Sequence, residues 1–320
     1  MNKLLLLLIF FSSCKAPAEA QKKSDSSYRE LPMEYHTGNV TLFGTLTLPE
    51  TAARKLTVCL LISGSGPTDR NGNNPAMKNE SLKMLAHALA DSGIASLRYD
   101  KRGVGESAIP NMKENDLRFE DYVQDAKGWI SVLKNDKRFN RVVVAGHSEG
   151  SLIGMIASQK DVNGFISLSG AGKPAGQLIS EQISIQAPML AEETDRIIDS
   201  LEAGNTVSQI NPMLSSLFRP SVQPYLISWF KYDPAVEISN LKIPVLIIQG
   251  DADLQIKTED AQALFAASKF GKEYVIHGMN HILKKVGSSN ADNMASYNDP
   301  SRPLHPELMA PIVNFIKSLP

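Results

Sequence analysis

From residue 56 onward, short apolar runs alternate with amphipathic segments. The apolar runs predict buried strands at Leu56–Ile62, Ile94–Tyr99, Arg141–Ala145, Gly164–Ser169, Val245–Gln249 and Glu273–Ile276. Between them, apolar residues recur at helical spacing near Leu82–Asp91, Phe119–Lys134, Ser151–Ser158, Thr258–Ala267 and Glu307–Leu319. This alternation is typical of the α/β class, with a mostly parallel, doubly wound sheet covered by helices on both faces.

Two segments depart from this alternation. Residues 28–50 alternate apolar and polar positions and turn at Gly38-Asn39, which predicts an N-terminal antiparallel hairpin. Residues 171–240 contain helical runs, aromatics and prolines but no convincing strand. A stretch of that length inside a compact domain needs structure of its own, so we expect a helical cap inserted over the site.

Composition excludes several classes of protein. The chain has 320 residues, of which 42% are hydrophobic, and a net charge of −1, so we expect no nucleic-acid partner and no electrostatic attraction to anionic membranes. Neither a C-x-x-C nor an H-E-x-x-H spacing occurs, and we expect no metal and no cofactor. Cys59 lies in the apolar run "LTVCLLI", where we expect a buried thiol.

The first residues predict export. A lysine precedes the apolar run Leu4–Phe11, which is too short to span a bilayer but suits a secretory signal over residues 1–20. The small residues before Cys14 favour a lipoprotein signal, with cleavage before Cys14 and lipidation of its thiol; ordinary cleavage after Ala18 or Ala20 is the alternative. Residues 21–30 then form a flexible tether to a domain over 31–320. We expect a protein of the periplasm or cell envelope that meets the membrane only through this anchor.

The stretch "RVVVAGHSEGSLIGMIAS" at 141–158 carries the first candidate chemistry. A buried strand must turn sharply into a helix, with Ser148 at the apex and glycines on both sides. In this context G-x-S-x-G predicts a nucleophile elbow, which exposes a serine hydroxyl above a sheet. His147 is expected to pack within the elbow and not to act as the base, because neighbouring side chains on a turn point apart.

A nucleophilic serine needs a histidine as base and a carboxylate that orients it. Downstream of Ser148, one apolar strand runs into a turn with Asp251 and Asp253, and a later strand is followed by His277 and His281. Both pairs follow the carboxyl ends of strands, where open α/β sheets gather reactive groups. We favour Asp253, which lies further into its loop, over Asp251. We favour His281, which follows a Gly-Met-Asn turn, over His277.

The oxyanion hole requires two backbone N–H donors. Glu149, directly after the nucleophile, supplies one; the glycine-rich loop "GSGPTDRNGNN" after an early strand supplies the other, which we assign to Ser65. A second glycine-rich turn, "RYDKRGVGES", follows the next strand. There we expect Asp100 and Arg102 to pair and brace the loop in a structural role.

Five blocks in this order resemble the α/β-hydrolase superfamily, and more narrowly bacterial serine esterases of the cinnamoyl/feruloyl-esterase and dienelactone-hydrolase-like branch. They are "LLISGSGPTDRNG", "RYDKRGVGES", "GHSEGS", "GDADLQ" and "GMNHILK". The resemblance extends from about residue 35 to the end. It implies Ser148 as nucleophile, His281 as base and Asp253 as orienting acid, with Ser65 and Glu149 as oxyanion donors and no cofactor.

These residues predict a serine hydrolase that cleaves carboxylic esters through an acyl-enzyme intermediate. The expected partner is a small-molecule ester, with a short-chain or an aryl or sugar acyl group. A serine peptidase or amidase on the same fold is one alternative, and a lipase acting on long chains is another. A ligand-binding lipoprotein that keeps the fold without catalysis is a third.

Overall fold

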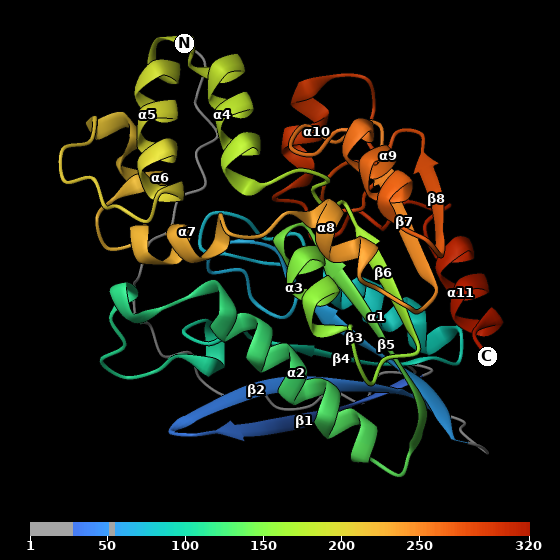
Figure 1. Cartoon of the computed structure of the whole chain (residues 1–320). Coiled ribbons are helices and arrows are strands. Elements are labelled where there is room, and N and C mark those ends of the chain that lie inside the picture. Colours follow the sequence, from blue (N-terminus) through green and yellow to red (C-terminus); the bar gives the residue numbers. More distant parts are fainter. Residues whose placement is uncertain (1–27, 51–54) are drawn as a thin grey trace.

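The computed structural model describes residues 28–50 and 55–320 (Figure 1). They form an eight-stranded sheet in the order β1-β2-β4-β3-β5-β6-β7-β8. The strands are β1 (Tyr28–Thr37), β2 (Val40–Pro49), β3 (Leu56–Ile62), β4 (Ala95–Tyr99), β5 (Phe139–His147), β6 (Gly164–Leu168), β7 (Val245–Gly250) and β8 (Gly271–Ile276). β2 pairs antiparallel with β1 and β4, and every other pairing is parallel. The predicted hairpin and mostly parallel sheet are therefore confirmed.

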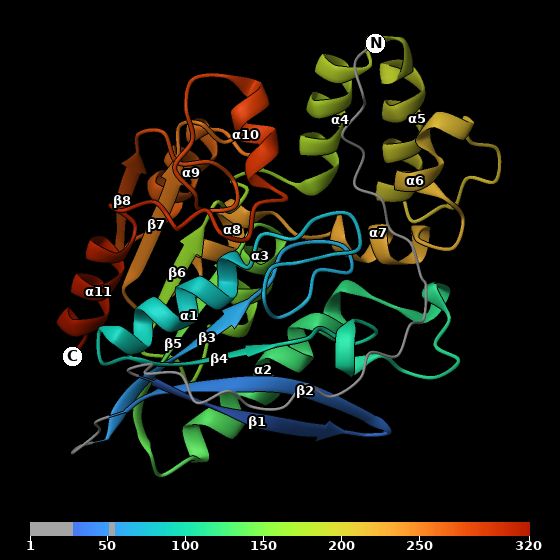
Figure 2. The ribbon, with the colours of Figure 1, turned by 180° about the vertical axis from the view of Figure 1, so that it is seen from behind.

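Helices cover both faces of this sheet because alternate strand residues point to opposite sides. In β3, Val58 and Leu60 join the apolar cluster under one set of helices, whereas Cys59 and Leu61 join the cluster under the other. Figure 1 shows α2 and α3 in front of the sheet, and Figure 2 shows α1 and α11 in front of the reverse face. The helices of the α/β body are α1 (Ser81–Asp91), α2 (Phe119–Asn135), α3 (Glu149–Ala157), α8 (Pro234–Ser239), α9 (Thr258–Ala267), α10 (Asn290–Ser296) and α11 (Met309–Ser318).

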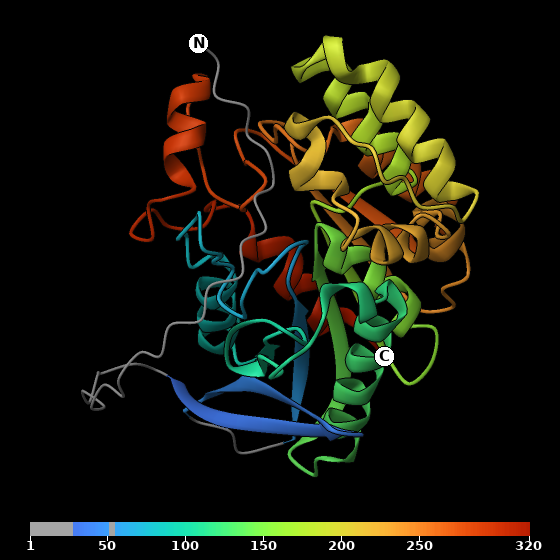
Figure 3. The ribbon, with the colours of Figure 1, turned by 90° about the vertical axis from the view of Figure 1, so that its left-hand side faces the viewer.

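Between β6 and β7 the chain forms helices and no strand, as the sequence predicts for a cap. The cap helices are α4 (Ala175–Gln186), α5 (Ala191–Glu202), α6 (Ser215–Phe218) and α7 (Gln223–Trp229). They lie together at one end of the molecule, beyond α2 and α3 (Figures 1 and 3). Helix α7 joins the cap to the body, since Tyr225 meets Phe119 and Tyr122 of α2 through their rings and the Phe119 N–H donates to Ser228.

The N-terminal boundary differs from the predicted one. β1 begins at Tyr28, inside the segment expected to be tether, because the Tyr28 hydroxyl and the Glu30 carboxylate both hydrogen-bond His87 of α1, each at 2.8 Å. The predicted signal, Cys14 and residues 21–27 of the tether lie outside the described residues. In the described part of the chain, no helix combines the length and apolar character needed to cross a bilayer.

The parallel strands bring distant segments to one edge. The loops that follow the carboxyl ends of β3, β5, β7 and β8 carry Ser65, Ser148, Asp253 and His281, respectively. Adjacent strands place neighbouring loops side by side, and β3 pairs with β5 as far as Ile62 opposite Gly146. The fold therefore directs all the predicted site residues to the same end of the sheet.

Candidate active site

Ser148 lies on a sharp turn between β5 and α3. Its backbone has φ 55° and ψ −123°, a conformation that residues with side chains rarely adopt. A β-carbon on Gly146 would lie 2.1 Å from the Gly150 carbonyl oxygen, and one on Gly150 would lie 2.4 Å from the Ile62 oxygen. Both positions therefore require glycine, and their close packing keeps Ser148 in its strained conformation.

Asp253 and His281 form a buried pair. Asp253 Oδ2 lies 2.8 Å from His281 Nδ1, and their side chains are 0% and 5% exposed. Asp253 Oδ1 accepts hydrogen bonds from the backbone N–H groups of Gln255 and Ile256, and its Oδ2 accepts one from Gln249. Burial opposes ionisation of Asp253, but the charge of His281 and these hydrogen bonds outweigh it and lower the pKa of the carboxyl group. The pair suits a carboxylate that orients an imidazole.

His147 connects this pair to the elbow. Its Nε2 lies 2.7 Å from the backbone oxygen of His281, and because a carbonyl oxygen only accepts, Nε2 carries the proton. Burial, together with the charge of His281, lowers the pKa of His147 to about 4. A neutral imidazole that holds the His281 backbone matches the packed residue expected from the sequence. Among the described residues, no hydrogen bond joins the side chains of Ser148 and His281.

Asp251 and His277, which the sequence analysis ranked below Asp253 and His281, pair with each other. His277 Nδ1 lies 2.7 Å from Asp251 Oδ2, and the Gly278 N–H donates to Asp251 Oδ1 at 2.7 Å. The His277 side chain is 96% exposed. This pair therefore lies at the surface, whereas Asp253 and His281 are buried beside the elbow.

The predicted oxyanion donors Ser65 and Glu149 belong to the loop after β3 and to the start of α3. The loop after β3 approaches the nucleophile so closely that a β-carbon on Gly64 would lie 3.1 Å from Ser148 Cβ. Within the described residues, the backbone N–H groups of Ser65 and Glu149 donate no hydrogen bond. The loop is braced by the hydroxyl of Thr68, which donates to the Ser65 carbonyl at 2.8 Å. Two unpaired donors next to a strained serine suit a site that binds an oxyanion.

Sequence reasoning missed a buried ion pair under this loop. Lys101 Nζ lies 2.5 Å from the Gly64 carbonyl oxygen and 3.3 Å from Glu149 Oε2, and the Tyr225 hydroxyl donates to Glu149 Oε1 at 2.5 Å. Burial lowers the pKa of Lys101, and the Glu149 carboxylate opposes that shift. Lys101 stands in the quoted "RYDKRGVGES" block, but nothing in a single sequence places its side chain under the loop.

The expected pairing in that block is wrong. Asp100 pairs with Arg70 at 2.7 Å, and Arg102 pairs with Asp125 of α2 at 2.5 Å. The side chains of residues 100 and 102 leave the turn in different directions, so each meets a separate element. The block is nevertheless structural in the sense predicted, because Asp100 also accepts the backbone N–H of Glu106 and closes its own turn.

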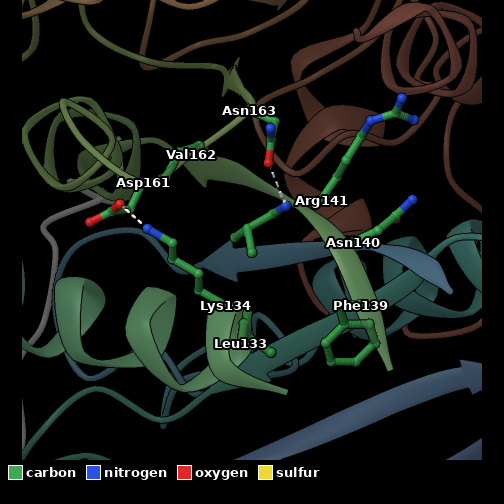
Figure 4. Close-up of a pocket in the computed structure, with 9 residues that line it drawn as sticks. Leu133, Lys134, Phe139, Asn140, Arg141, Asp161, Val162 and Asn163 are labelled. Carbon is green, nitrogen blue, oxygen red and sulfur yellow. Dashed lines mark hydrogen bonds and ion pairs between the residues drawn. The ribbon is translucent and has the colours of Figure 1, made fainter. Parts of the chain in front are cut away.

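A hollow of about 320 Å³ lies far from these residues (Figure 4). It is lined by residues around Phe139 at the start of β5, and by Val162 and Asn163 ahead of β6. Ser148 follows the other end of β5, which at about 3.3 Å per residue is roughly 25 Å away. This hollow therefore takes no part in the candidate site. Among the described residues, no group of three or more His, Cys, Asp or Glu side chains could hold a metal ion.

Known proteins with similar sequences are hydrolases. Residues 78–218 match the model of the family described as serine aminopeptidase, S33. Esterase EstD of Thermotoga maritima is 28% identical over 249 residues, which is 75% of this chain and 57% of EstD. The chain has the α/β-hydrolase fold and resembles hydrolases in sequence. The resemblance predicted from its motifs is confirmed at that level.

Solved structures show that this chain shares its fold with esterases. Est1E from Butyrivibrio proteoclasticus, solved with ferulic acid bound, superposes with a TM-score of 0.57 at 17% identity, over 82% of this chain and 94% of Est1E. Esterase Pf2001 from Pyrococcus furiosus superposes with a TM-score of 0.58 at 17% identity, over 95% of this chain and 99% of Pf2001. The chain spans 57% of the length of EstD.

Proposed function

We propose that this protein is a serine esterase that cleaves carboxylic esters with Ser148, His281 and Asp253. The observation that carries the proposal is the buried Asp253–His281 pair, which His147 ties by a 2.7 Å hydrogen bond to the strained turn that holds Ser148. A nucleophile, a base and an orienting acid together are what acyl transfer needs.

In the proposed mechanism, Ser148 Oγ attacks the ester carbonyl carbon and His281 Nε2 takes the hydroxyl proton. Asp253 holds Nδ1, fixes the tautomer and stabilises the imidazolium. The N–H groups of Ser65 and Glu149 bind the oxygen that becomes negative. His281 then protonates the departing alcohol, and a water molecule that His281 deprotonates releases the acid from the acyl-enzyme.

We further propose that the substrate is a small ester with a short-chain or an aryl or sugar acyl group. The ferulic acid bound to Est1E, which shares the fold, is an aryl acid and supports the aryl alternative. The cap reaches the candidate site through Tyr225 of α7, whose hydroxyl donates to Glu149 next to Ser148. This contact supports the proposal that cap residues influence which acyl group fits.

A peptidase is the second candidate, favoured by the description of the matching family as serine aminopeptidases. Such an enzyme needs a free carboxylate to bind the amino group of its substrate. Glu149, next to the nucleophile, is 6% exposed and already occupied by Lys101 and Tyr225, so it does not meet that need. We therefore place ester hydrolysis first.

The test is hydrolysis of p-nitrophenyl acetate, butyrate and decanoate, methyl ferulate and an aminoacyl p-nitroanilide by the full chain, beside Ser148→Ala. We expect turnover of acetate, butyrate or methyl ferulate by the parent, and a loss of at least about 10³-fold in Ser148→Ala. Faster cleavage of the anilide would favour the peptidase. Inert parent protein that also fails to react with a fluorophosphonate at Ser148 would contradict any serine hydrolase.

A further inference from the structure

Lys101 is a buried cation for which the mechanism above has no role. It is 1% exposed, and its Nζ lies 4.9 Å from the centre of the Tyr122 ring as well as close to Glu149. Burying an ammonium group is costly unless it is paired and hydrogen-bonded. The partners of Lys101 are therefore informative. The Gly64 carbonyl belongs to the same peptide group as the Ser65 N–H, and Glu149 is the residue whose own N–H is the other candidate oxyanion donor.

The contact with Gly64 bears directly on Ser65. The Gly64 carbonyl and the Ser65 N–H belong to the same planar, trans peptide group, so they point in opposite directions. With the Gly64 oxygen held 2.5 Å from Lys101 Nζ, the Ser65 N–H must point away from the lysine. A cation on the carbonyl oxygen also polarises the peptide and strengthens its N–H as a donor.

The contact with Glu149 bears on the second donor. Lys101 and the Tyr225 hydroxyl each bind one oxygen of the Glu149 carboxylate, and that residue's own N–H is the other candidate donor. Tyr225 belongs to cap helix α7. The buried Lys101–Glu149 pair therefore connects the loop after β3, the elbow and the cap.

We infer that Lys101 is a positioning residue for the oxyanion hole, which fixes the Gly64–Ser65 peptide and, through Glu149, links it to Tyr225 of the cap. The inference rests on the proposed esterase function and deepens it. Lys101 touches neither substrate nor the reacting atoms; it acts through the orientation of the Ser65 N–H.

Lys101→Met in the full chain tests the inference, because it removes the ammonium group and keeps a side chain of similar length. With p-nitrophenyl butyrate we expect kcat to fall about 10- to 100-fold, since misplacing one donor costs somewhat less than deleting it. We expect KM to stay within about two-fold, because the donor acts mainly in the transition state.

A trifluoromethyl ketone inhibitor separates positioning from general loosening of the fold. Ser148 Oγ adds to the ketone carbon, the carbonyl π electrons move to oxygen, and the serine proton goes to His281, so the adduct carries an oxyanion. The inhibition constant of Lys101→Met should rise by about the factor by which kcat/KM falls. An unchanged kcat and inhibition constant, with only a lower Tm, would overturn the inference.

Arg98→Met is the matched control. Arg98 is also a buried cation, 2% exposed, and it is held by Glu30 at 2.7 Å and Thr47 at 2.8 Å. It belongs to β4, only three residues before Lys101. We expect a lower Tm with kcat within about two-fold of the parent. An equal loss of kcat in this variant would show that any buried cation has the same effect, which contradicts positioning.

Glu149→Gln separates the carbonyl contact from the ion pair. This change keeps the backbone N–H and an oxygen for Tyr225, and it leaves Lys101 bound to Gly64. We expect a smaller loss of kcat than in Lys101→Met. A loss as large or larger would contradict the Gly64 contact as the cause.

If Lys101→Met does not fold because Glu149 is left as an unpaired buried charge, the double variant Lys101→Met/Glu149→Gln removes both charges. We expect it to keep the loss of kcat, and recovery of kcat in the double variant would overturn the inference. A parent protein that is inert toward esters overturns the proposed function and this inference with it. An active parent with an unaffected Lys101→Met overturns this inference alone.

Discussion

His147, His277 and His281, near the carboxyl edge of the sheet, differ in burial and in partners, and these differences support different proposed roles. His281 is buried against Asp253, His147 is buried and donates to the His281 carbonyl, and His277 is exposed and pairs with Asp251. A general base needs both a carboxylate partner and access to the nucleophile. Only His281 has a carboxylate partner beside the elbow.

These roles predict opposite outcomes for two alanine variants. His281→Ala should lower kcat for p-nitrophenyl butyrate by at least about 10³-fold, because it removes the base. His277→Ala removes a surface imidazole whose partner stays solvated, so kcat should remain within about two-fold of the parent. Steady-state kinetics of the two purified variants make the comparison. A severe loss in His277→Ala with retention in His281→Ala would assign the base to the other histidine.

His147 predicts a specific dependence of stability on pH. Its pKa falls from 6.5 to about 4 on folding, so the native state binds fewer protons than the unfolded state between these values. The contribution is therefore complete above pH 6.5 and is lost as the pH falls toward 4. Between pH 7 and pH 5 the loss of unfolding free energy from this group is roughly 2 kcal/mol.

Urea unfolding of His147→Gln, which keeps an N–H donor, tests this prediction. The free energy of unfolding of the variant should vary less with pH than that of the parent, by about that amount. Identical pH profiles for parent and variant would contradict a neutral, buried His147.

Individual residues show what a single sequence reveals. The places of Ser148, Asp253 and His281 after the ends of β5, β7 and β8 were predictable, because apolar strands precede all three. Their catalytic roles stay a prediction. The place of Lys101 was not predictable, since its contacts with Gly64 and Glu149 join residues 37 and 48 positions apart. The Asp100–Arg102 pair was predicted from proximity in sequence, but each side chain found a partner on another element, Arg70 and Asp125.

At the scale of elements, the elbow depends on two glycines. Gly146→Ala would place a β-carbon 2.1 Å from the Gly150 carbonyl oxygen, so backbone must move and both Tm and activity should collapse. Gly204→Ala is the control: its φ of +82° disfavours a side chain, but no atom lies within 4 Å. That variant should lose only about 1 kcal/mol of stability and keep its activity. Thermal unfolding of both variants checks this, and a Gly146→Ala protein as stable as Gly204→Ala would contradict the close packing of the elbow.

Helices and strands with a clear apolar pattern were predicted close to their observed bounds. The predicted strand Leu56–Ile62 has the observed bounds, and the predicted helix Phe119–Lys134 ends one residue early. Helix α10 was not predicted, because Asn290–Ser296 has little apolar periodicity and is fixed by tertiary contacts. Among these are hydrogen bonds from Asn280 Nδ2 to Asn293 and Ser296. The arrangement of the cap likewise depends on contacts that no local pattern encodes.

At the scale of the whole molecule, the cap and the body share one apolar core. Ile197 and Phe218 of the cap belong to the same buried cluster as Trp129 and Phe119 of α2. The Tyr225–Glu149 hydrogen bond adds a polar link within this packing. Cap residues can therefore alter the candidate site without touching a substrate, and we expect substitutions in α7 to change kcat as well as acyl preference.

Attachment of the molecule to the membrane is the last prediction. We propose that Cys14 is lipidated after export, because small residues precede it and a short apolar run precedes them. In a bacterial host, the parent should incorporate labelled palmitate and sediment with membranes, whereas Cys14→Ser should do neither.

Cys59→Ser is the matched control. The Cys59 thiol is buried inside the fold, so incorporation of label and sedimentation should be unchanged. Export of an unlabelled, soluble parent would instead support ordinary cleavage after Ala18 or Ala20. The proposed catalytic residues Ser148, Asp253 and His281 lie far from Cys14 in the sequence, so we expect Cys14→Ser to keep any esterase activity of the parent and to change only where the protein is found.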